Sequence, residues 1–253
     1  MKKIKILTYN IHKGFSTTNL TYALKQIKGS IQKVHADLVF LQEVIGHHDD
    51  HTEHMDDWPS SSQFEYLADQ TWPHLAYGKN AIYTEGHHGN AILSKHSIHF
   101  SENEDISFSK IERRGLLHAE IKDGNHTLHA FCVHLGLFEK DRSEQIRKLS
   151  ARIKKLVPSN DALIIAGDFN DWRQSATDLL ISGLKVKEAF LETTGKHANT
   201  FPSWFPCLPL DRVYYRNLNC TSVKVLHGNL WKKQSDHLPI LAEFEFLEKP
   251  ERE

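Results

Sequence analysis

The sequence contains little cysteine, little proline and no long apolar run. The cysteines, Cys132, Cys207 and Cys220, number 3 and include no C-x-x-C pair, so neither a disulfide framework nor a thiolate zinc site is indicated. Only 8 prolines and 13 glycines occur among 253 residues, and 40% of the residues are hydrophobic. This composition excludes a collagen-like or disordered chain. No apolar run approaches the ~20 residues that a membrane-spanning helix requires.

The chain also has no large excess of positive or negative charge. The chain has 31 Lys and Arg against 32 Asp and Glu, which gives a formal net charge of −1. A protein that grips long duplex DNA is usually more basic, because phosphate neutralisation supplies most of that affinity. The balance therefore argues against a DNA-coating role, but it allows a local basic cleft.

The start of the chain is positively charged but lacks a long apolar stretch. Residues 3–10 partly alternate between apolar and polar and include β-branched side chains, which predicts a strand rather than a signal peptide. We therefore expect a cytoplasmic protein, and we consider a peripheral position at the inner face of the membrane as well.

Strand-length apolar runs are mixed with helical stripes along the chain. The expected strands are residues 3–10, 37–44, 90–94, 115–122, 126–135, 162–169, 211–216, 221–226 and 238–246, and the expected helices are residues 20–34, 63–70, 139–157 and 175–182. One sheet could not bury so many strands, whereas two packed sheets with helices outside would. We expect a single domain over residues 1–248 and a short polar tail at 249–253.

A histidine-rich segment, residues 46–62, interrupts this pattern with closely spaced histidines and carboxylates. Such a density could bind a metal ion such as zinc, but we favour an exposed polar insertion. The stretch Gly86-His87-His88-Gly89 is interpreted as a turn that could line a cleft.

Polar residues lie at or near the ends of the expected strands, where a buried scaffold can position a site. They are Asn10, Glu43, Asn90, His134, Asp168, Asn170, Asp211, Asp236 and His237. A lone Asn or Asp at such a place is usually a turn former or a helix cap. Glu43 is harder to dismiss, because a carboxylate among apolar residues is costly unless it is paired or bound to a metal. Asp168 and Asn170 are two residues apart, so in an extended chain their side chains would point the same way.

Seven short motifs that contain these residues occur in order along the chain. They are Thr8-Tyr9-Asn10-Ile11, Leu41-Gln42-Glu43-Val44, Gly89-Asn90-Ala91-Ile92-Leu93-Ser94, Val133-His134-Leu135, Gly167-Asp168-Phe169-Asn170, Leu210-Asp211-Arg212-Val213 and Ser235-Asp236-His237. In this order they resemble the endonuclease/exonuclease/phosphatase superfamily, whose fold is that of deoxyribonuclease I. The resemblance implies an α/β fold, a four-layer αββα sandwich of two packed mixed β-sheets flanked by helices. Residues 112–117 and 200–204 further resemble a small bacterial branch whose gene often neighbours that of cardiolipin synthase.

The resemblance also implies a metal site. Glu43 resembles the metal-binding glutamate of the superfamily, and Asn10 and Asp236 would complete or support the site. Mg²⁺ is the expected ion, with Mn²⁺ as an alternative, because hard oxygen ligands and phosphate suit such cations.

Further roles follow from the same motifs. Asp168 and Asn170 would position the attacking water and the scissile phosphate. His237 would pair with Asp211, which would hold its tautomer and stabilise the imidazolium. His134 matches a histidine that contacts a phosphate oxygen or protonates the leaving group. The resemblance therefore gives the set of catalytic residues but does not say which of them is the acid and which is the base.

Substrate binding would involve Asn10, Asn90, Arg114 and Trp172. Arg114 is a candidate phosphate clamp, although a solvated arginine at the start of a strand is an equal interpretation. Trp172 could stack on a base, enter a lipid interface or pack on the sheets.

The implied reaction is metal-dependent hydrolysis of a phosphodiester by water, with DNA, RNA or a phospholipid headgroup as the substrate. Two alternatives stay open: a phosphomonoesterase acting on a small soluble phosphate, and a non-catalytic binding protein with the same fold. No obligate protein partner is implied, and we expect a monomer.

Overall fold

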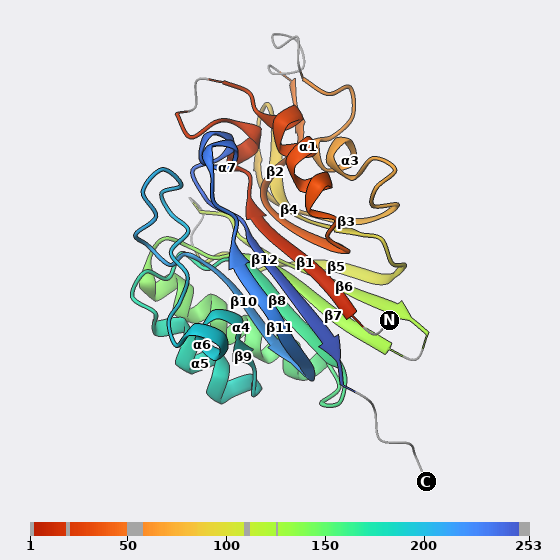
Figure 1. The fold of residues 1–253 in the computed structure, drawn as a ribbon, viewed down its shortest axis with the longest axis vertical. Coiled ribbons are helices and arrows are strands. Elements are labelled where there is room, and N and C mark those ends of the chain that lie inside the picture. Colours follow the sequence, from red (N-terminus) through yellow and green to blue (C-terminus); the bar gives the residue numbers. More distant parts are fainter. Residues whose placement is uncertain (1–2, 19–20, 50–57, 109–111, 125, 248–253) are drawn as a thin grey trace.

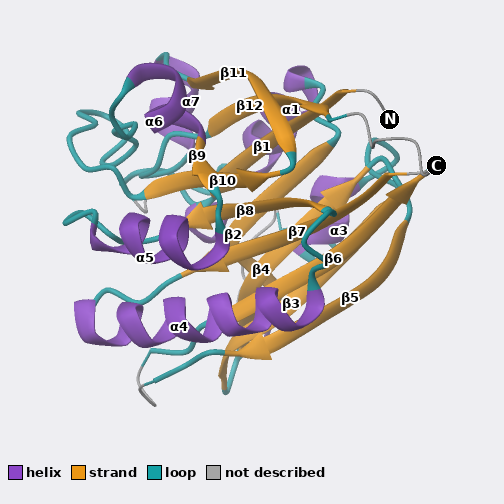
Figure 2. Cartoon of the chain, turned by 90° about the horizontal axis from the view of Figure 1, so that it is seen from below, coloured by secondary structure: helices purple, strands orange, loops and turns teal. Residues whose placement is uncertain are grey.

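The computed structural model describes residues 3–18, 21–49, 58–108, 112–124 and 126–247. In this part of the chain two six-stranded sheets pack against each other, with helices on their outer faces (Figure 1 and Figure 2). The expected αββα sandwich is therefore confirmed. The single domain over residues 1–248 stays a prediction, and the polar tail at 249–253 lies outside the described residues.

The first sheet has the strand order β11-β12-β1-β2-β4-β3. Its strands are β11 (Leu218–Val225), β12 (Ile240–Phe246), β1 (Lys3–Asn10), β2 (Leu38–His48), β4 (Gly86–Ser94) and β3 (His74–Tyr83). The sheet is mixed, because β1 runs parallel to β2 and antiparallel to β12. The carboxyl ends of β1 and β2 therefore lie at the same edge, with Asn10 opposite Gln42.

The second sheet has the order β5-β6-β7-β8-β10-β9. Its strands are β5 (Ile98–Asp105), β6 (Gly115–Asp123), β7 (His126–His134), β8 (Ala162–Asp168), β10 (Asp211–Arg216) and β9 (Lys187–Glu188). β7 and β8 are parallel and pair His134 with Asp168, whereas β10 is antiparallel to β8 and pairs Asp211 with Asp168. Three polar residues therefore stand in one row at the end of this sheet.

Three apolar layers hold the sandwich together. The middle layer lies between the sheets and joins residues such as Phe40 and Ile92 to Leu117 and Ile164. The outer layer of the first sheet is covered by α1 (Leu24–Val34), α3 (Gln63–Ala68) and α7 (Asn229–Gln234), and that of the second sheet by α4 (Glu139–Leu156) and α5 (Ser175–Leu184). Burial of these faces drives the packing, at roughly 25 cal/mol per Å² of apolar surface.

Two short helical segments complete the elements: η1 (His12–Gly14) directly after β1, and α6 (Ala189–Thr194). None of the helices in the described ranges combines the length and the apolar character needed to cross a bilayer.

Several expected elements differ from the structure. The first helix begins at Leu24 rather than residue 20, because Tyr22 forms a bridge with Phe15. The stretch at Gly86–Gly89 is the start of β4 and not a turn, so that interpretation was wrong. β2 continues through His48 into the histidine-rich segment, while residues 50–57 of that segment lie outside the described part.

Candidate active site

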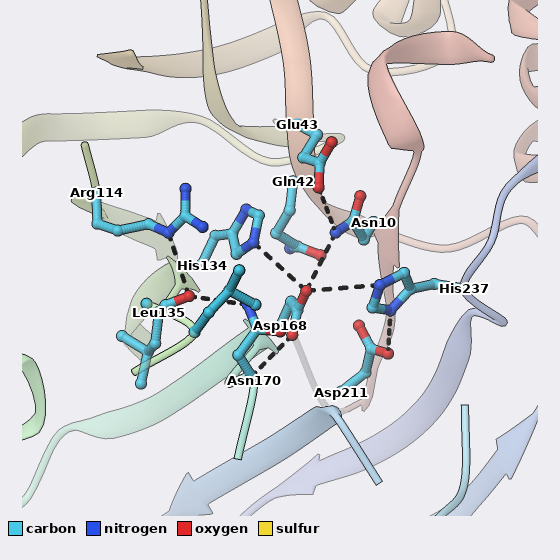
Figure 3. Close-up of polar contacts among 12 residues, drawn as sticks. Asn10, Gln42, Glu43, Arg114, His134, Leu135, Asp168, Asn170, Asp211 and His237 are labelled. Atoms are coloured by element: carbon cyan, nitrogen blue, oxygen red, sulfur yellow. Dashed lines mark hydrogen bonds and ion pairs between the residues drawn. The ribbon is translucent and has the colours of Figure 1, made fainter. Parts of the chain in front are cut away.

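Polar side chains from four strand ends and one loop meet at one edge of the sandwich (Figure 3). Asn10 ends β1, His134 ends β7, Asp168 ends β8 and Asp211 begins β10, while His237 lies just before β12. The sequence placed these residues at strand ends, and the fold brings them together because two of the strand pairs are parallel.

Local backbone distortions aim two of the carboxylates. β2 shifts register between Leu41 and Val44, and Glu43 in this bulge has a φ of 58°. Bulges turn a side chain out of the regular alternation and are frequent beside active sites. Gly167, with a φ of 147°, precedes Asp168, and a Cβ there would lie 2.0 Å from the carbonyl oxygen of Val133. Only glycine allows this close approach of β7 and β8.

Asn10 connects the two carboxylates. Its Nδ2 donates to Oε1 of Glu43 and to Oδ2 of Asp168, both at 3.1 Å (Figure 3). Its Oδ1 accepts from the backbone N–H of His12 at 3.0 Å. The amide is thereby fixed in one orientation, which sets the spacing of Glu43 and Asp168.

His237 is held by Asp211, as expected. Nδ1 of His237 lies 2.8 Å from Oδ2 of Asp211, and Nε2 lies 3.7 Å from Oδ2 of Asp168. Thr200 donates its hydroxyl to the same Asp211 oxygen at 2.6 Å. Since the carboxylate fixes Nδ1 as a donor, Nε2 is directed toward Asp168.

The electrostatics of the two histidines differ. Burial would lower the pKa of His237, but the charges of Asp211 and Asp168 outweigh burial and raise it. The pKa of His134 falls well below its usual value because the ring is buried and Arg114 and His237 lie near. His237 is thus held as imidazolium and His134 as neutral imidazole.

The carboxylates also differ. Burial raises the pKa of Asp168, and the neighbouring Asp211 adds to this while His237 opposes it. Burial likewise acts to raise the pKa of Glu43, but the hydrogen bond from Asn10 and nearby positive charges lower it overall. Glu43 therefore stays ionised, whereas Asp168 can take up a proton more readily than an ordinary aspartate.

The donor set suits a hard divalent cation. Ionised Glu43 forms no ion pair with any cation of the described residues, and its one hydrogen bond comes from the neutral amide of Asn10. Asp168, Asp211 and His237 offer ligand atoms within 4.8 Å of one another, but Nδ1 of His237 is already engaged with Asp211. An ionised carboxylate without an ion-pair partner among the described residues is a hard oxygen ligand, which fits Mg²⁺ better than a nitrogen-preferring ion.

Asn170 and Arg114 line the same region. Asn170 has a φ of 49°, so the chain turns after Asp168 and the expected extended geometry was wrong. Its backbone N–H donates to Oδ1 of Asp168, and its Nδ2 donates to the carbonyl of Leu135, each at 2.9 Å. Nε of Arg114 donates to that same carbonyl at 3.2 Å, while its Nη2 pairs with Glu112 at 2.7 Å.

Three other expected residues have different surroundings. Asn90 is fully buried, and its Nδ2 donates to the carbonyls of Gly115 and Cys132 in the other sheet. Asp236 lies 3.3 Å from Nδ1 of His12. The partly exposed Trp172 stacks with the guanidinium of Arg142 at 4.7 Å. Substrate binding by Asn90 and Trp172 and metal binding by Asp236 stay predictions.

Sequence reasoning missed His88, on β4 two residues before Asn90. Its Nδ1 is buried and has no hydrogen-bond partner among the described residues. Burial lowers the pKa of His88 to about 4, as does the charge of Lys13, while Glu43 opposes the shift. The sequence could have indicated His88 as a neighbour of Glu43 only if residues 86–89 had been predicted as a strand rather than a turn.

The chain belongs to the endonuclease/exonuclease/phosphatase family, whose model matches residues 7–237. A relative, the uncharacterized protein YbhP of Escherichia coli (strain K12), is 43% identical over 241 residues, covering 94% of this chain and 95% of that protein. Proteins of this family usually bind a divalent metal.

Solved structures share the fold. An endonuclease/exonuclease/phosphatase from Beutenbergia cavernae is similar with a TM-score of 0.77 and 17% identity, covering 100% of this chain and 74% of that one. D. rerio TDP2, complexed with a single strand DNA product, has a TM-score of 0.72 and 19% identity, with coverage of 96% and 99%. The human Nocturnin catalytic domain, with a bound sulfate anion, has a TM-score of 0.74 and 19% identity, with coverage of 97% and 94%.

Proposed function

We propose that this protein is a metal-dependent hydrolase that cleaves a phosphodiester bond by water attack, in a nucleic acid or a phospholipid headgroup. One observation carries the proposal. Oδ2 of the buried Asp168 lies 3.1 Å from Nδ2 of Asn10, 3.5 Å from Nε2 of His134 and 3.7 Å from Nε2 of His237. A carboxylate surrounded by donors in a water-poor site is suited to orient and deprotonate a water molecule.

The proton of the attacking water goes to Asp168, because its raised pKa brings the carboxylate closer to neutral pH. In an in-line displacement the entering and leaving oxygens lie on opposite sides of phosphorus. Nε2 of His237 lies only 3.7 Å from Asp168 and so belongs to the entering side. His237, held positive by Asp211, stabilises negative charge on a phosphoryl oxygen, and the leaving alkoxide takes its proton from solvent.

Glu43 would hold the metal, with Asn10 and Asp236 supporting it, and Mg²⁺ or Mn²⁺ suits these oxygen donors. A bound divalent ion would neutralise charge on the phosphoryl group. The neutral His134 would offer an N–H to a phosphate oxygen, and Arg114, anchored by Glu112 and Leu135, would add a positive charge beside it.

The structural neighbours support an anionic phosphoryl ligand. One of them, D. rerio TDP2, was solved with a single strand DNA product, and another, human Nocturnin, with a sulfate anion. These likenesses lie below 20% identity and bring the ligand class, not a particular substrate, to this chain.

The proposal is tested by comparing hydrolysis of bis(p-nitrophenyl) phosphate and p-nitrophenyl phosphate in the presence of Mg²⁺, Mn²⁺ or EDTA. We expect cleavage of the diester with either metal and none with EDTA. A preference for the monoester would replace the proposal with a phosphatase. Activity that persists in EDTA would exclude the metal dependence.

A further inference from the structure

An apolar groove lies beside the candidate active site, between α1, α7 and the loop that carries Trp204. It has a volume of about 560 Å³, within the ~300–1,000 Å³ typical of small-molecule sites. Tyr22, Ala23, Trp204 and Leu230 form its apolar wall. α1 and α7 lie next to each other at the upper end of the molecule (Figure 1).

A single layer of residues separates this groove from the catalytic cluster. Thr17 lines the groove and donates its hydroxyl to the carbonyl of Ser235 at 2.8 Å. The hydroxyl of Ser235 in turn donates to the carbonyl of Asn10 at 2.7 Å. On the neighbouring loop, the Phe201 ring lies 5.0 Å from that of His237, while Trp204, three residues later, faces the groove. The groove and the catalytic cluster are therefore neighbours in the fold, linked through Ser235 and the loop of residues 201–204.

The rim of the groove combines exposed apolar and positive side chains. Trp204 is 65% exposed, the adjacent Phe205 is 64% exposed and Leu230 is 51% exposed. Such exposure of large apolar side chains is costly unless a ligand or surface covers them. Lys232 and Lys233 line the same groove, and neither forms an ion pair with the described residues. Their charges complement an anionic group.

The groove wall is mostly apolar, although Ser16, Thr18, Thr21 and Gln26 also line it. The Thr17 hydroxyl is taken by main-chain carbonyls, and the Gln234 amide nitrogen donates to Ser30 at 2.8 Å. Oε1 of Gln234 is left buried without a partner in the described structure, and it can accept from one hydroxyl. A nucleobase would leave several polar edges unpaired in such a place, which is expensive. A hydrocarbon chain has no such edges.

We propose that the groove binds an acyl chain of an anionic phospholipid whose phosphodiester enters the catalytic cluster. The inference rests on the proposed function and narrows its substrate class. Trp204 and Phe205 would contact the lipid interface, where amphipathic aromatic side chains are favoured. Lys232 and Lys233 would attract the anionic lipid surface around the bound molecule.

The test measures binding of monomeric lysophosphatidylglycerols of increasing chain length by isothermal titration calorimetry. We expect the affinity to rise by about fourfold per added methylene while the chain fits in the groove. Leu230→Asp should weaken binding by about tenfold or more, because it places a charge against the chain. Trp204→Ala should weaken binding too. Leu179→Asp is the matched control, since Leu179 is 42% exposed on α5, on the other sheet.

Hydrolysis of bis(p-nitrophenyl) phosphate, which needs no acyl site, is measured on the same variants. Unchanged diester hydrolysis with lost lysolipid binding in Leu230→Asp supports the inference. Wild-type protein that cleaves the small diester but shows no chain-length dependence overturns the acyl site and leaves the proposed function standing. If Leu230→Asp weakens the binding of oligothymidylate rather than of lysolipid, the groove binds nucleic acid and the acyl site is overturned. Absence of diester cleavage with intact chain-length dependence would overturn the proposed function and leave the groove as a lipid-binding site.

Discussion

The Nε2 atoms of His134 and His237 approach the same oxygen, Oδ2 of Asp168, at 3.5 and 3.7 Å. Their pKa values nevertheless move in opposite directions. Burial and the positive neighbours Arg114 and His237 lower that of His134, whereas Asp211 and Asp168 overcome burial and raise that of His237. One site thus holds a neutral imidazole and an imidazolium beside one carboxylate, which suits His134 to offer an N–H and His237 to stabilise negative charge.

Replacing Asp211 with asparagine should separate these roles. Asp211→Asn keeps the shape but removes the charge that raises the pKa of His237, so the pKa of His237 should fall. Turnover should drop by ~10²–10³-fold, the usual cost of losing one group that stabilises negative charge in the transition state. NMR titration of the imidazole nitrogens measures the shift. An unchanged His237 pKa would show that Asp211 does not control it.

The metal site can be examined through Glu43. Glu43→Gln removes an ionised carboxylate that forms no ion pair with the described residues, so Mg²⁺ affinity should fall by about tenfold or more, with partial recovery of activity at high metal concentration. Isothermal titration with Mg²⁺ measures this change. Asp49→Asn, in the exposed pair of His47 and Asp49, is the control and should bind Mg²⁺ like the wild type. An equal loss in the control would move the metal to the histidine-rich segment.

A buried histidine pair should make stability fall in mild acid. Nε2 of His118 lies 3.1 Å from Nδ1 of His129, with Glu102, Asp161 and Arg152 around them. Burial first, and the neighbouring histidine next, lower the pKa of His118 to about 4. The unfolded chain then binds more protons below about pH 6.5, so the free energy of unfolding falls as pH falls from there toward the folded pKa.

The variant His118→Phe tests this pH dependence, because it keeps the stacking on Phe131, where the ring centroids are 4.3 Å apart. Between neutral pH and about pH 5, the free energy of unfolding of the variant should fall by about 1–3 kcal/mol less than that of the wild type. Urea denaturation at both pH values measures the difference. Parallel pH profiles for the two proteins would contradict the explanation.

Asn90 should contribute to the stability of the fold whether or not it contacts substrate. Its Nδ2 donates to the carbonyls of Gly115 and Cys132, so Asn90→Ala removes two buried hydrogen bonds and should lower the free energy of unfolding by about 1–3 kcal/mol. Denaturant titration measures the loss. Asn160→Ala in an exposed turn is the control, and an equally small effect in both would remove the role of Asn90 as a connection between the sheets.

The sequence predicted the buried strands well and the edge strands poorly. β8 is a continuous apolar run because both of its faces are covered, so its pattern is unambiguous. β5 is an edge strand with the sequence IHFSENED, and much of it faces solvent, so no apolar alternation marks it. β3 is interrupted at Lys79 and Ala81 by a register shift, which breaks its period.

The residues of the candidate site also divide into those that the sequence could indicate and those that it could not. Asn10, His134, Asp168 and Asp211 could be predicted because each stands at the end of an apolar run. The hydroxyl of Thr200, which holds Asp211, comes from a loop 11 residues earlier, and the resemblance of residues 200–204 to a bacterial branch gave it no role. The aim of Glu43 depends on a bulge, and bulges arise from pairing between distant strands.

In the proposed reaction, Asp168 takes the proton from water during metal-dependent cleavage of a phosphodiester. This role can be tested by kcat/KM for bis(p-nitrophenyl) phosphate with saturating Mg²⁺, compared among wild type, Asp168→Asn and the surface control Asp178→Asn. We expect a fall of ~10²–10⁴-fold in Asp168→Asn and wild-type values in Asp178→Asn. Full activity in a folded Asp168→Asn protein would contradict it.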